Sequence, residues 1–266
     1  MSHRKIRFAG QLVAFAGVML AEITTEVEAL AEGHCTDTRG EIEVDRPDVT
    51  NSSVVVPEGS LQIENGVNLT QQGAARLVDG PNTRVRFGLG GCNEFLVDLP
   101  NYTYSLSRGS ASGFSDISPA IKHQIGPLPG DIDLSATLGI ALPTGNPAVS
   151  GSGYQAYLQF PWSHELGGGW EISGMVTAFW YPNDSTRRGL LQPTLVIEHQ
   201  VMFYADLFVE YVGGYPTHGA PSQLLNSGGA YRFTRLQQLD FHLAFGLDER
   251  APRYSFGIGY SIRWDR

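Results

Sequence analysis

The stretch from Tyr254 to Trp264 alternates strictly between large apolar residues and small or polar ones. Side chains on a β-strand point alternately to opposite faces, so this stretch predicts a strand with one apolar face and one small or polar face. Aromatic residues stand at both ends of the run. This placement is typical of a strand that crosses between two membrane–water interfaces.

The same alternation recurs between turn signals and predicts about twelve strands. In the stretch 131–142, for example, Ile132, Leu134, Leu138 and Ile140 alternate with aspartate, serine, threonine and glycine. An even strand number is what a closed bacterial barrel requires. We therefore expect an all-β protein, a closed antiparallel transmembrane β-barrel of about 12 strands with a short N-terminal periplasmic segment. The predicted strands are 59–70, 81–89, 93–104, 114–125, 131–142, 153–161, 169–181, 190–200, 202–212, 224–234, 237–246 and 253–264.

The composition agrees with many strands joined by tight turns. The chain of 266 residues contains 32 glycines and only 17% charged residues. Its formal net charge of −9 argues against a nucleic-acid partner. The mean hydropathy of −0.13 fits a soluble protein and a membrane barrel equally well, because only alternate residues of a barrel strand face lipid.

The N-terminal region has the parts of a secretory signal peptide. Arg4 and Lys5 give a basic start, residues 8–21 form an apolar core, and Ala29-Leu30-Ala31 matches an A-x-A cleavage site. We expect residues 1–31 to be the signal peptide, with cleavage after Ala21 as the alternative. Residues 32–58 would then be a periplasmic segment or a plug, and residues 59–264 the barrel.

Two cysteines, Cys35 and Cys92, follow the signal. An even count in an oxidising compartment favours a disulfide, and two free thiols are the alternative. With both termini in the periplasm, the predicted topology places Cys92 in a periplasmic turn on the same side as Cys35.

The predicted connections are longer on average outside than inside, as in outer-membrane barrels. The predicted outer loops are 71–80, 105–113, 143–152, 182–189, 213–223 and 247–252. The predicted periplasmic turns are Gly90–Cys92, Gly126–Gly130, Trp162–Gly168, Val201 and Thr234–Leu236. The turn Trp162–Gly168 is the exception to the rule of short inner turns.

Aromatic residues gather near the predicted strand ends, where two interfacial girdles would lie. A soluble β protein, which is the alternative fold, would place more of them in mid-strand. The residues are Tyr102, Tyr104, Trp162, Trp170, Trp180, Tyr181, Tyr211, Tyr231, Phe233, Tyr254 and Trp264.

Several short motifs carry a resemblance to a known family. They include Asp45-Arg46-Pro47-Asp48, the run Leu158-Gln-Phe-Pro-Trp162, and Gly167-Gly-Gly-Trp170. From about residue 43 to the C-terminus, the chain resembles the outer-membrane transporter-like family named for the meta-pathway of phenol degradation. The resemblance implies an outer-membrane location and passage of small hydrophobic or aromatic compounds, and it supplies no catalytic residue that can be assigned to this chain. We expect no cofactor.

The end of the chain looks like the barrel-assembly signal of outer-membrane proteins. Gly259, Ile262 and Trp264 hold the expected spacing, and Asp265 and Arg266 follow the aromatic residue. The expected partners are outer-membrane lipid, lipopolysaccharide, the barrel-assembly machinery and a small hydrophobic or aromatic solute.

The residues opposite to the apolar faces would line the lumen. Their charges have to be paired or hydrated, because burying an unpaired charge costs several kcal/mol. Two interpretations stay open: a polar channel, and a structural or receptor-like barrel with a filled interior. The N-terminal segment is suited to a plug through Asp45, Arg46 and Asp48. The lumen residues that we single out are Glu64, Arg84, Arg86, Asp98, Glu198, Asp206, Glu210, Arg232, Asp240 and His242.

A lipid hydrolase is a further alternative, because some twelve-stranded barrels have that activity. The sequence contains no Gly-x-Ser-x-Gly motif, no Cys/His cluster for zinc and no spaced carboxylates for calcium. His123 and His199 have lipid-side parity, which favours an interfacial role over catalysis. We expect no enzymatic activity and no metal site.

Overall fold

The structure is a computed structural model that describes residues 35–36, 38–150, 153–181 and 189–266. The predicted signal peptide, residues 1–31, lies outside the described residues. In the described part of the chain, no helix is long and apolar enough to cross a membrane.

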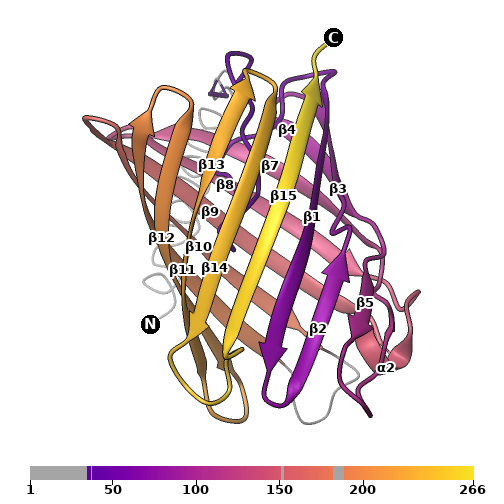
Figure 1. Ribbon diagram of the computed structural model, residues 1–266. Helices are drawn as coiled ribbons and strands as arrows, with labels where there is room; N and C mark the ends of the chain where they lie inside the picture. The colour runs from indigo at the N-terminus through magenta and orange to yellow at the C-terminus, as the bar shows by residue number, and fades with distance from the viewer. Residues whose placement is uncertain (1–34, 37, 151–152, 182–188) are drawn as a thin grey trace, which may run out of the picture. The chain divides into compact units, whose positions relative to one another are not determined.

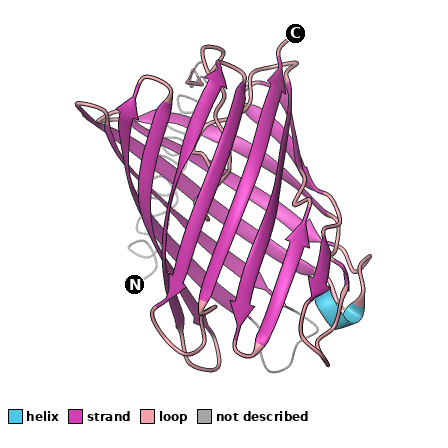
Figure 2. Ribbon diagram, in the orientation of Figure 1, coloured by secondary structure: helices cyan, strands magenta, loops and turns pink. Residues whose placement is uncertain are grey.

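Residues 61–264 form one closed antiparallel sheet (Figures 1 and 2). β1 pairs with β15 from Leu61↔Trp264 to Gln71↔Tyr254, and this pairing closes the barrel. The elements are β1 (Leu61–Gln72), β2 (Ala75–Gly80), β3 (Arg84–Gly90), β4 (Asn93–Asp98), β5 (Tyr102–Ser105), β6 (Gly113–Phe114), β7 (Ser118–Leu128), β8 (Ile132–Ala141), α2 (Pro147–Ser150), β9 (Gln155–Gly167), β10 (Trp170–Trp180), β11 (Gly189–Met202), β12 (Ala205–Pro216), β13 (Ser222–Thr234), β14 (Gln237–Gly246) and β15 (Tyr254–Trp264).

The predicted closed barrel of twelve strands is confirmed, although three of its strands are each divided into two segments. β2 continues into β3, β4 into β5, and β6 into β7, with interruptions at 81–83, 99–101 and 115–117. Pro81 and Pro100 lie in two of these interruptions, and proline cannot donate to the hydrogen-bond ladder. The outward-facing positions change parity across such a break, from Phe95 on β4 to Tyr102 and Tyr104 on β5, and the sequence prediction of continuous strands missed this change.

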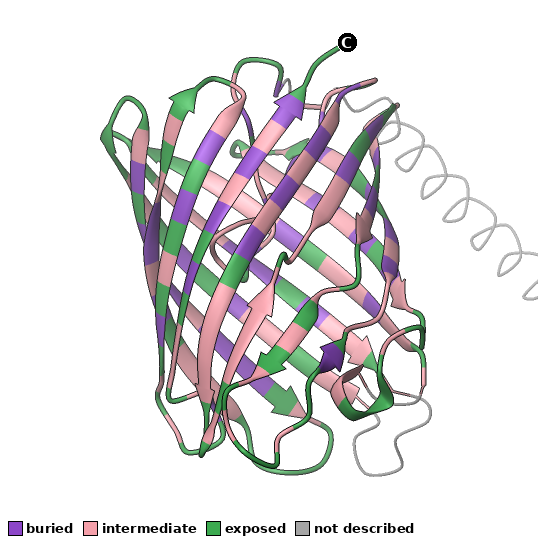
Figure 3. Ribbon diagram, turned by 45° about the vertical axis from the view of Figure 1, so that its right-hand side comes forward, coloured by how far each residue is buried: buried purple, intermediate pink, exposed green. Residues whose placement is uncertain are grey.

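The two faces of each strand differ in exposure (Figure 3). On β14, Leu239 and Phe241 are 50% and 49% exposed, whereas Gln238 and Asp240 are 2% and 4% exposed. Apolar residues therefore cover the outside of the barrel and polar residues line its inside. This is the reverse of a soluble β-protein and is the pattern of a barrel surrounded by lipid.

One end of the barrel, which we call the turn end, carries the C-terminus and the short connections (Figure 1, top). The other end, the loop end, carries α2 and the connection 106–112. At the turn end, β9 and β10 meet at Gly167, Gly168 and Gly169, whose φ angles of 82°, 64° and 80° are in the left-handed region that favours glycine.

Some of the predicted connections were wrong. The predicted turn Trp162–Gly168 is strand, because β9 runs to Gly167, and Ser163 and Glu165 are inward-facing strand positions. The predicted loop 71–80 is mostly β2, since the chain reverses at 73–74. The predicted turn Gly126–Gly130 is shorter, because Gly126 belongs to a β-bulge inside β7. Val201 belongs to β11, and the turn lies at 203–204.

Candidate functional site in the lumen

The described residues between Cys35 and Ser60 precede the first strand, and we call them the luminal segment. Cys35 forms a disulfide with Cys92 in the turn between β3 and β4, with the two Cα atoms 5.4 Å apart. Between this disulfide and β1, the segment makes hydrogen bonds with inward-facing side chains of many strands. Both ends of the segment are thus attached at the turn end.

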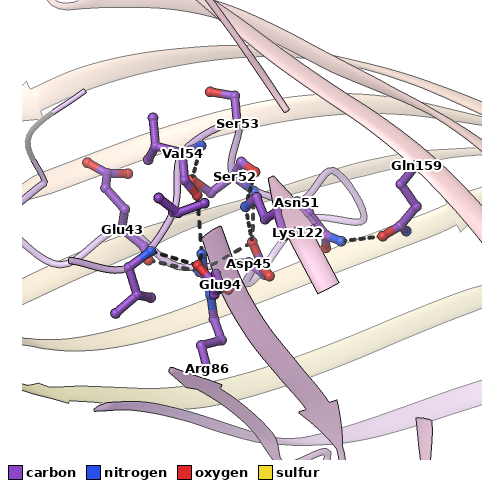
Figure 4. A network of polar contacts seen from close by, with 12 residues as sticks. Glu43, Asp45, Asn51, Ser52, Ser53, Val54, Arg86, Glu94, Lys122 and Gln159 are labelled. Atoms are coloured by element: carbon purple, nitrogen blue, oxygen red, sulfur yellow. Dashed lines mark hydrogen bonds and ion pairs between the residues drawn. The ribbon is translucent and has the colours of Figure 1, made fainter. Parts of the chain in front are cut away.

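Asp45 is the centre of the first group of contacts (Figure 4). One of its carboxylate oxygens lies 2.9 Å from Arg84 Nη1, and the other lies 3.3 Å from Arg86 Nη1 and 3.9 Å from Lys122 Nζ. The backbone N–H of Ser52 also donates to this carboxylate, at 2.9 Å. The segment thus places one buried carboxylate among three cations from β3 and β7.

Arg86 connects this group to the barrel wall. Its side chain is fully buried and donates to Glu94 through Nε at 2.7 Å and to Glu64 through Nη1 at 3.1 Å. It also donates to two backbone carbonyls of the segment, those of Glu43 and Val54. Arg84 makes a bidentate pair with Asp98, at 2.7 and 2.9 Å. The planar guanidinium fork suits such paired contacts with carboxylates.

Glu210 on β12 holds the segment from another wall. Its carboxylate accepts hydrogen bonds from the backbone N–H groups of Val49 and Thr50 at 2.9 Å each, and from the Thr50 hydroxyl at 2.8 Å. Asn226 on β13 donates to the same carboxylate at 2.9 Å. The Thr50 hydroxyl further contacts the hydroxyl of Thr194 on β11.

The guanidinium group of Arg46 packs against two glycines of the barrel wall, Gly66 and Gly259. Arg46 pairs with Asp240 at 3.4 Å, and a Cβ added at Gly66 or Gly259 would collide with its guanidinium group. These two glycines face each other across β1 and β15. Glycine is required here because of the close approach of a side chain, since neither residue has a positive φ.

Basic residues near the turn end bind the beginning of the segment. Arg263 donates to the carbonyls of Thr38, Arg39 and Glu41 at 2.8 to 3.2 Å. Arg232 pairs with Asp206 and with Glu41. The carbonyls of an irregular segment need such donors, because the lumen wall removes them from bulk water.

Two carboxylates of the lumen wall have no cationic partner in the described part of the chain. Glu171 and Glu198 are directly opposite each other on β10 and β11. Among the described residues, neither makes a hydrogen bond or an ion pair within the usual distances. One side of the lumen is therefore acidic and unpaired, while the cations of β3 and β7 are bound to carboxylates.

The two aspartates of the segment have opposite environments. Burial raises the pKa of Asp45, but Arg86, Lys122 and Arg84 together lower it more, so this pKa lies below its ordinary value. Burial raises the pKa of Asp48 well above its ordinary value, and the carboxylates of Glu210 and Glu198 raise it further. The segment thus carries one ionised anchor and one carboxyl group that favours the protonated state.

The structure brings most of the predicted lumen residues into contact with the segment or with one another. Glu64, Arg84, Arg86, Glu210 and Asp240 contact the segment directly. Asp98 contacts Arg84, and Asp206 contacts Arg232. His242 does not reach Glu210 directly, because Asn226 lies between them.

Contact residues that were missed from the sequence include Thr50, Thr194, Asn226, Gln159 and Ser163. Strand parity would have placed Asn226 and Thr194 inside the barrel, but uncharged residues gave no further signal. Gly259, Ile262 and Trp264 lie on β15, with Trp264 exposed on the outside. In the described part of the chain, no histidine ring contacts a serine hydroxyl, and no cluster of side chains is suited to a metal ion.

A family model described as "Putative MetA-pathway of phenol degradation" matches residues 44–264. The COG4313 outer membrane channel from Pseudomonas putida F1 superposes with a TM-score of 0.64 at 17% identity, covering 84% of this chain and 100% of that chain. The NanC porin superposes at 0.55 with 8% identity, covering 76% and 98%. The KdgM porin superposes at 0.54 with 6% identity, covering 77% and 99%. No curated protein matches the chain. The fold is that of bacterial outer-membrane barrels.

Proposed function

Because the chain belongs to the family named for the meta-pathway of phenol degradation, we propose that it is an outer-membrane channel for small hydrophobic or aromatic compounds. The observation that carries the proposal is a closed barrel with a lipid-type exterior and a polar, charged interior. The similar barrel from Pseudomonas putida F1 is described as an outer membrane channel, which supports this function.

The luminal segment is proposed to be a plug that controls passage. It binds cations on β3 and β7 through Asp45, and it binds Glu210 on β12 through Val49 and Thr50. A segment held from two walls restricts the path between them. Opening then requires that the contacts of one wall be broken.

The experiment that tests the channel is uptake of radiolabelled phenol or toluate by cells with and without the protein. Heat-modifiable gel mobility of the outer-membrane fraction shows in parallel that the barrel is folded. We expect faster uptake in cells that contain the protein. Unchanged uptake with a folded barrel would contradict the proposal for these solutes.

A matched pair of variants tests the plug. Asp45→Asn removes a charge that binds three cations, so we expect a larger conductance in planar bilayers than for the wild type. Asp48→Asn removes a carboxyl group that faces other carboxylates, so we expect no such increase. An equal effect of the two variants would contradict the proposed anchor at Asp45.

A structural barrel with a filled interior is the second candidate, favoured by the number of contacts between segment and wall. It predicts a heat-modifiable band together with unchanged uptake in the wild type and in Asp45→Asn. The uptake and conductance measurements therefore separate the two functions. Lipid hydrolysis is not proposed, and the absence of enzymatic activity stays a prediction.

A further inference from the structure

A row of inward positions without charged side chains, which we call the apolar belt, crosses the lumen wall from β4 to β11. Its members are directly opposite one another on neighbouring strands, so they form one continuous row. The belt consists of Leu96, Ala120, Gly139, Tyr157, Phe179 and Leu190.

The next inward row towards the turn end is polar, and the luminal segment binds it. Lys122 Nζ donates to the Ser52 carbonyl at 2.6 Å, and Asn51 Nδ2 donates to Gln159 Oε1 at 3.1 Å (Figure 4). The apolar belt therefore lies beside the segment, on its loop-end side. The polar row consists of Lys122, Thr137, Gln159 and Thr177.

Aromatic rings form the part of the belt on β9 and β10. The ring centroids of Tyr157 and Phe179 are 6.1 Å apart and their planes are inclined by 51°, which is within the range of favourable aromatic pairs. Phe179 also stacks on Tyr181, with centroids 6.4 Å apart and an angle of 28°. Tyr157 is buried, whereas Phe179 and Tyr181 are only partly buried. Aromatic surface therefore remains uncovered between the loop end and the segment.

Packing within the wall explains only one of these rings. The ring of Tyr157 lies across β8, since a Cβ added at Gly139 would collide with it. Phe179 has no such glycine beside it, because its cross-strand neighbours are Tyr157 and Leu190. A partly exposed aromatic ring on the inner wall keeps apolar surface in contact with water. A solute that covers this surface gains hydrophobic free energy.

We propose that Phe179 and Tyr157 bind the ring of a monocyclic aromatic solute at the lumen wall. The proposal rests on the proposed channel function and deepens it by naming residues that select the solute. Polar side chains lie on both sides of the belt: the Ser118 hydroxyl contacts that of Tyr157 at 3.5 Å, and Gln159 donates to Thr177 at 3.3 Å. A phenol-type solute can therefore lay its ring on Phe179 while its hydroxyl group reaches a polar row.

The experiment is a fluorine nuclear magnetic resonance titration of para-fluorophenol with the purified full-length barrel in detergent. Unlabelled phenol and cyclohexanol, which have similar size and the same hydroxyl group, compete with the probe. We expect saturable binding, and we expect phenol to displace the probe at about three- to tenfold lower concentration than cyclohexanol does. The reason is that a saturated ring lacks the flat face that stacks on Phe179.

Three variants test the named residues. Phe179→Leu stays apolar but removes the aromatic face, so the Kd for para-fluorophenol should rise about three- to tenfold. Gly139→Ala displaces the ring of Tyr157 and should raise the Kd as well. Phe160→Leu is the matched control, since Phe160 is 41% exposed on the lipid face of β9, and it should leave the Kd unchanged. Heat-modifiable mobility identifies the variants that are folded.

Equal displacement by phenol and cyclohexanol would overturn the site, and this comparison requires no variant. An unchanged Kd in folded Phe179→Leu, or the same rise in Phe160→Leu, would overturn it too. Binding is measured whether or not the solute crosses the barrel. If uptake fails while the binding pattern is found, the channel proposal falls and the site stands. If uptake is found without the binding pattern, the site falls and the channel stands.

Discussion

Arg86 is the residue on which most of the buried charges of the lumen depend. It contacts Asp45, Glu64 and Glu94, and all four side chains are almost completely buried. The value of such a group is asymmetric: removing one member leaves the others charged and without a partner, which costs more than the pair contributed.

We predict that Arg86→Met lowers the free energy of unfolding by about 3–5 kcal/mol, because buried carboxylates lose their common cation. The measurement is urea-induced unfolding of the barrel in lipid vesicles, followed by tryptophan fluorescence. Arg76→Met on β2 is the control, since Arg76 is exposed and its guanidinium group contacts only the side chain of Gln71 among the described residues, and we expect a change within about 0.5 kcal/mol. Equal losses in the two variants would contradict the role of Arg86.

Asp48 gives a pH dependence whose sign follows from its raised pKa. Because the pKa of Asp48 is raised when the segment is bound to the lumen wall, its carboxyl group stabilises the bound state at pH values below the ordinary aspartate pKa. This stabilisation is lost as the pH rises through the raised pKa. Asp45 has a lowered pKa and acts in the opposite sense, but its contribution is lost only as the pH falls through that lowered value. Above about pH 4, Asp48 therefore decides the sign.

We predict that channel conductance rises as the pH rises above the ordinary pKa of aspartate, and that this rise is smaller in Asp48→Asn. Planar-bilayer recordings at constant ionic strength measure the effect. Identical pH profiles for the wild type and the variant would show that Asp48 does not control the segment.

At the scale of elements, the luminal segment is a loop closed by a covalent bond. The disulfide Cys35–Cys92 fixes its beginning, and its end continues into β1. Without the disulfide, the residues before Asp45 would be held by hydrogen bonds and ion pairs alone, among them those of Arg263 and Arg232 near the turn end and that of Arg86 with the Glu43 carbonyl.

We predict that the double variant Cys35→Ser/Cys92→Ser is cleaved by trypsin after Arg39 several times faster than the wild type, because the beginning of the segment opens more often. Protection of the Val49 and Thr50 amides should change little, since Glu210 still holds them. Wild-type protein treated with a reductant is the matched comparison and should behave like the variant. Equal cleavage rates with and without the disulfide would refute the prediction.

For the molecule as a whole, paired and unpaired charges are distributed unevenly around the lumen. The cations of β3 and β7 all form ion pairs with carboxylates. Glu171 on β10 and Glu198 on β11 lie next to each other on another part of the lumen wall. A path lined by unpaired carboxylates attracts cations and repels anions, as acidic rings do in cation channels.

We predict that the pore prefers K⁺ over Cl⁻, and that Glu171→Gln/Glu198→Gln lowers this preference about twofold or more. Reversal potentials in a KCl gradient at about pH 9, where neighbouring carboxylates are ionised, measure the preference. Glu249→Gln, in the connection between β14 and β15, is the control and should leave the ratio unchanged. A ratio that does not change in the double variant would place the ion path elsewhere.

The sequence by itself determined the number of strands and, within an uninterrupted strand, the face on which each side chain lies. These are local properties, because side chains along a strand point alternately to its two faces. For this reason, Glu64, Asp206 and Asp240 could be assigned to the lumen without a structure. Local glycines were ambiguous, since Gly126 marks a bulge and Gly167 ends a longer strand.

Only the tertiary structure decided which inward residues meet. The contact of Asp45 with Arg84, Arg86 and Lys122, and that of Thr50 with Glu210, join residues that lie far apart in the chain. Such contacts depend on the register around the closed barrel and on the path of an irregular segment through it. That segment has no periodicity, so its position is set by the charges and donors of the completed wall.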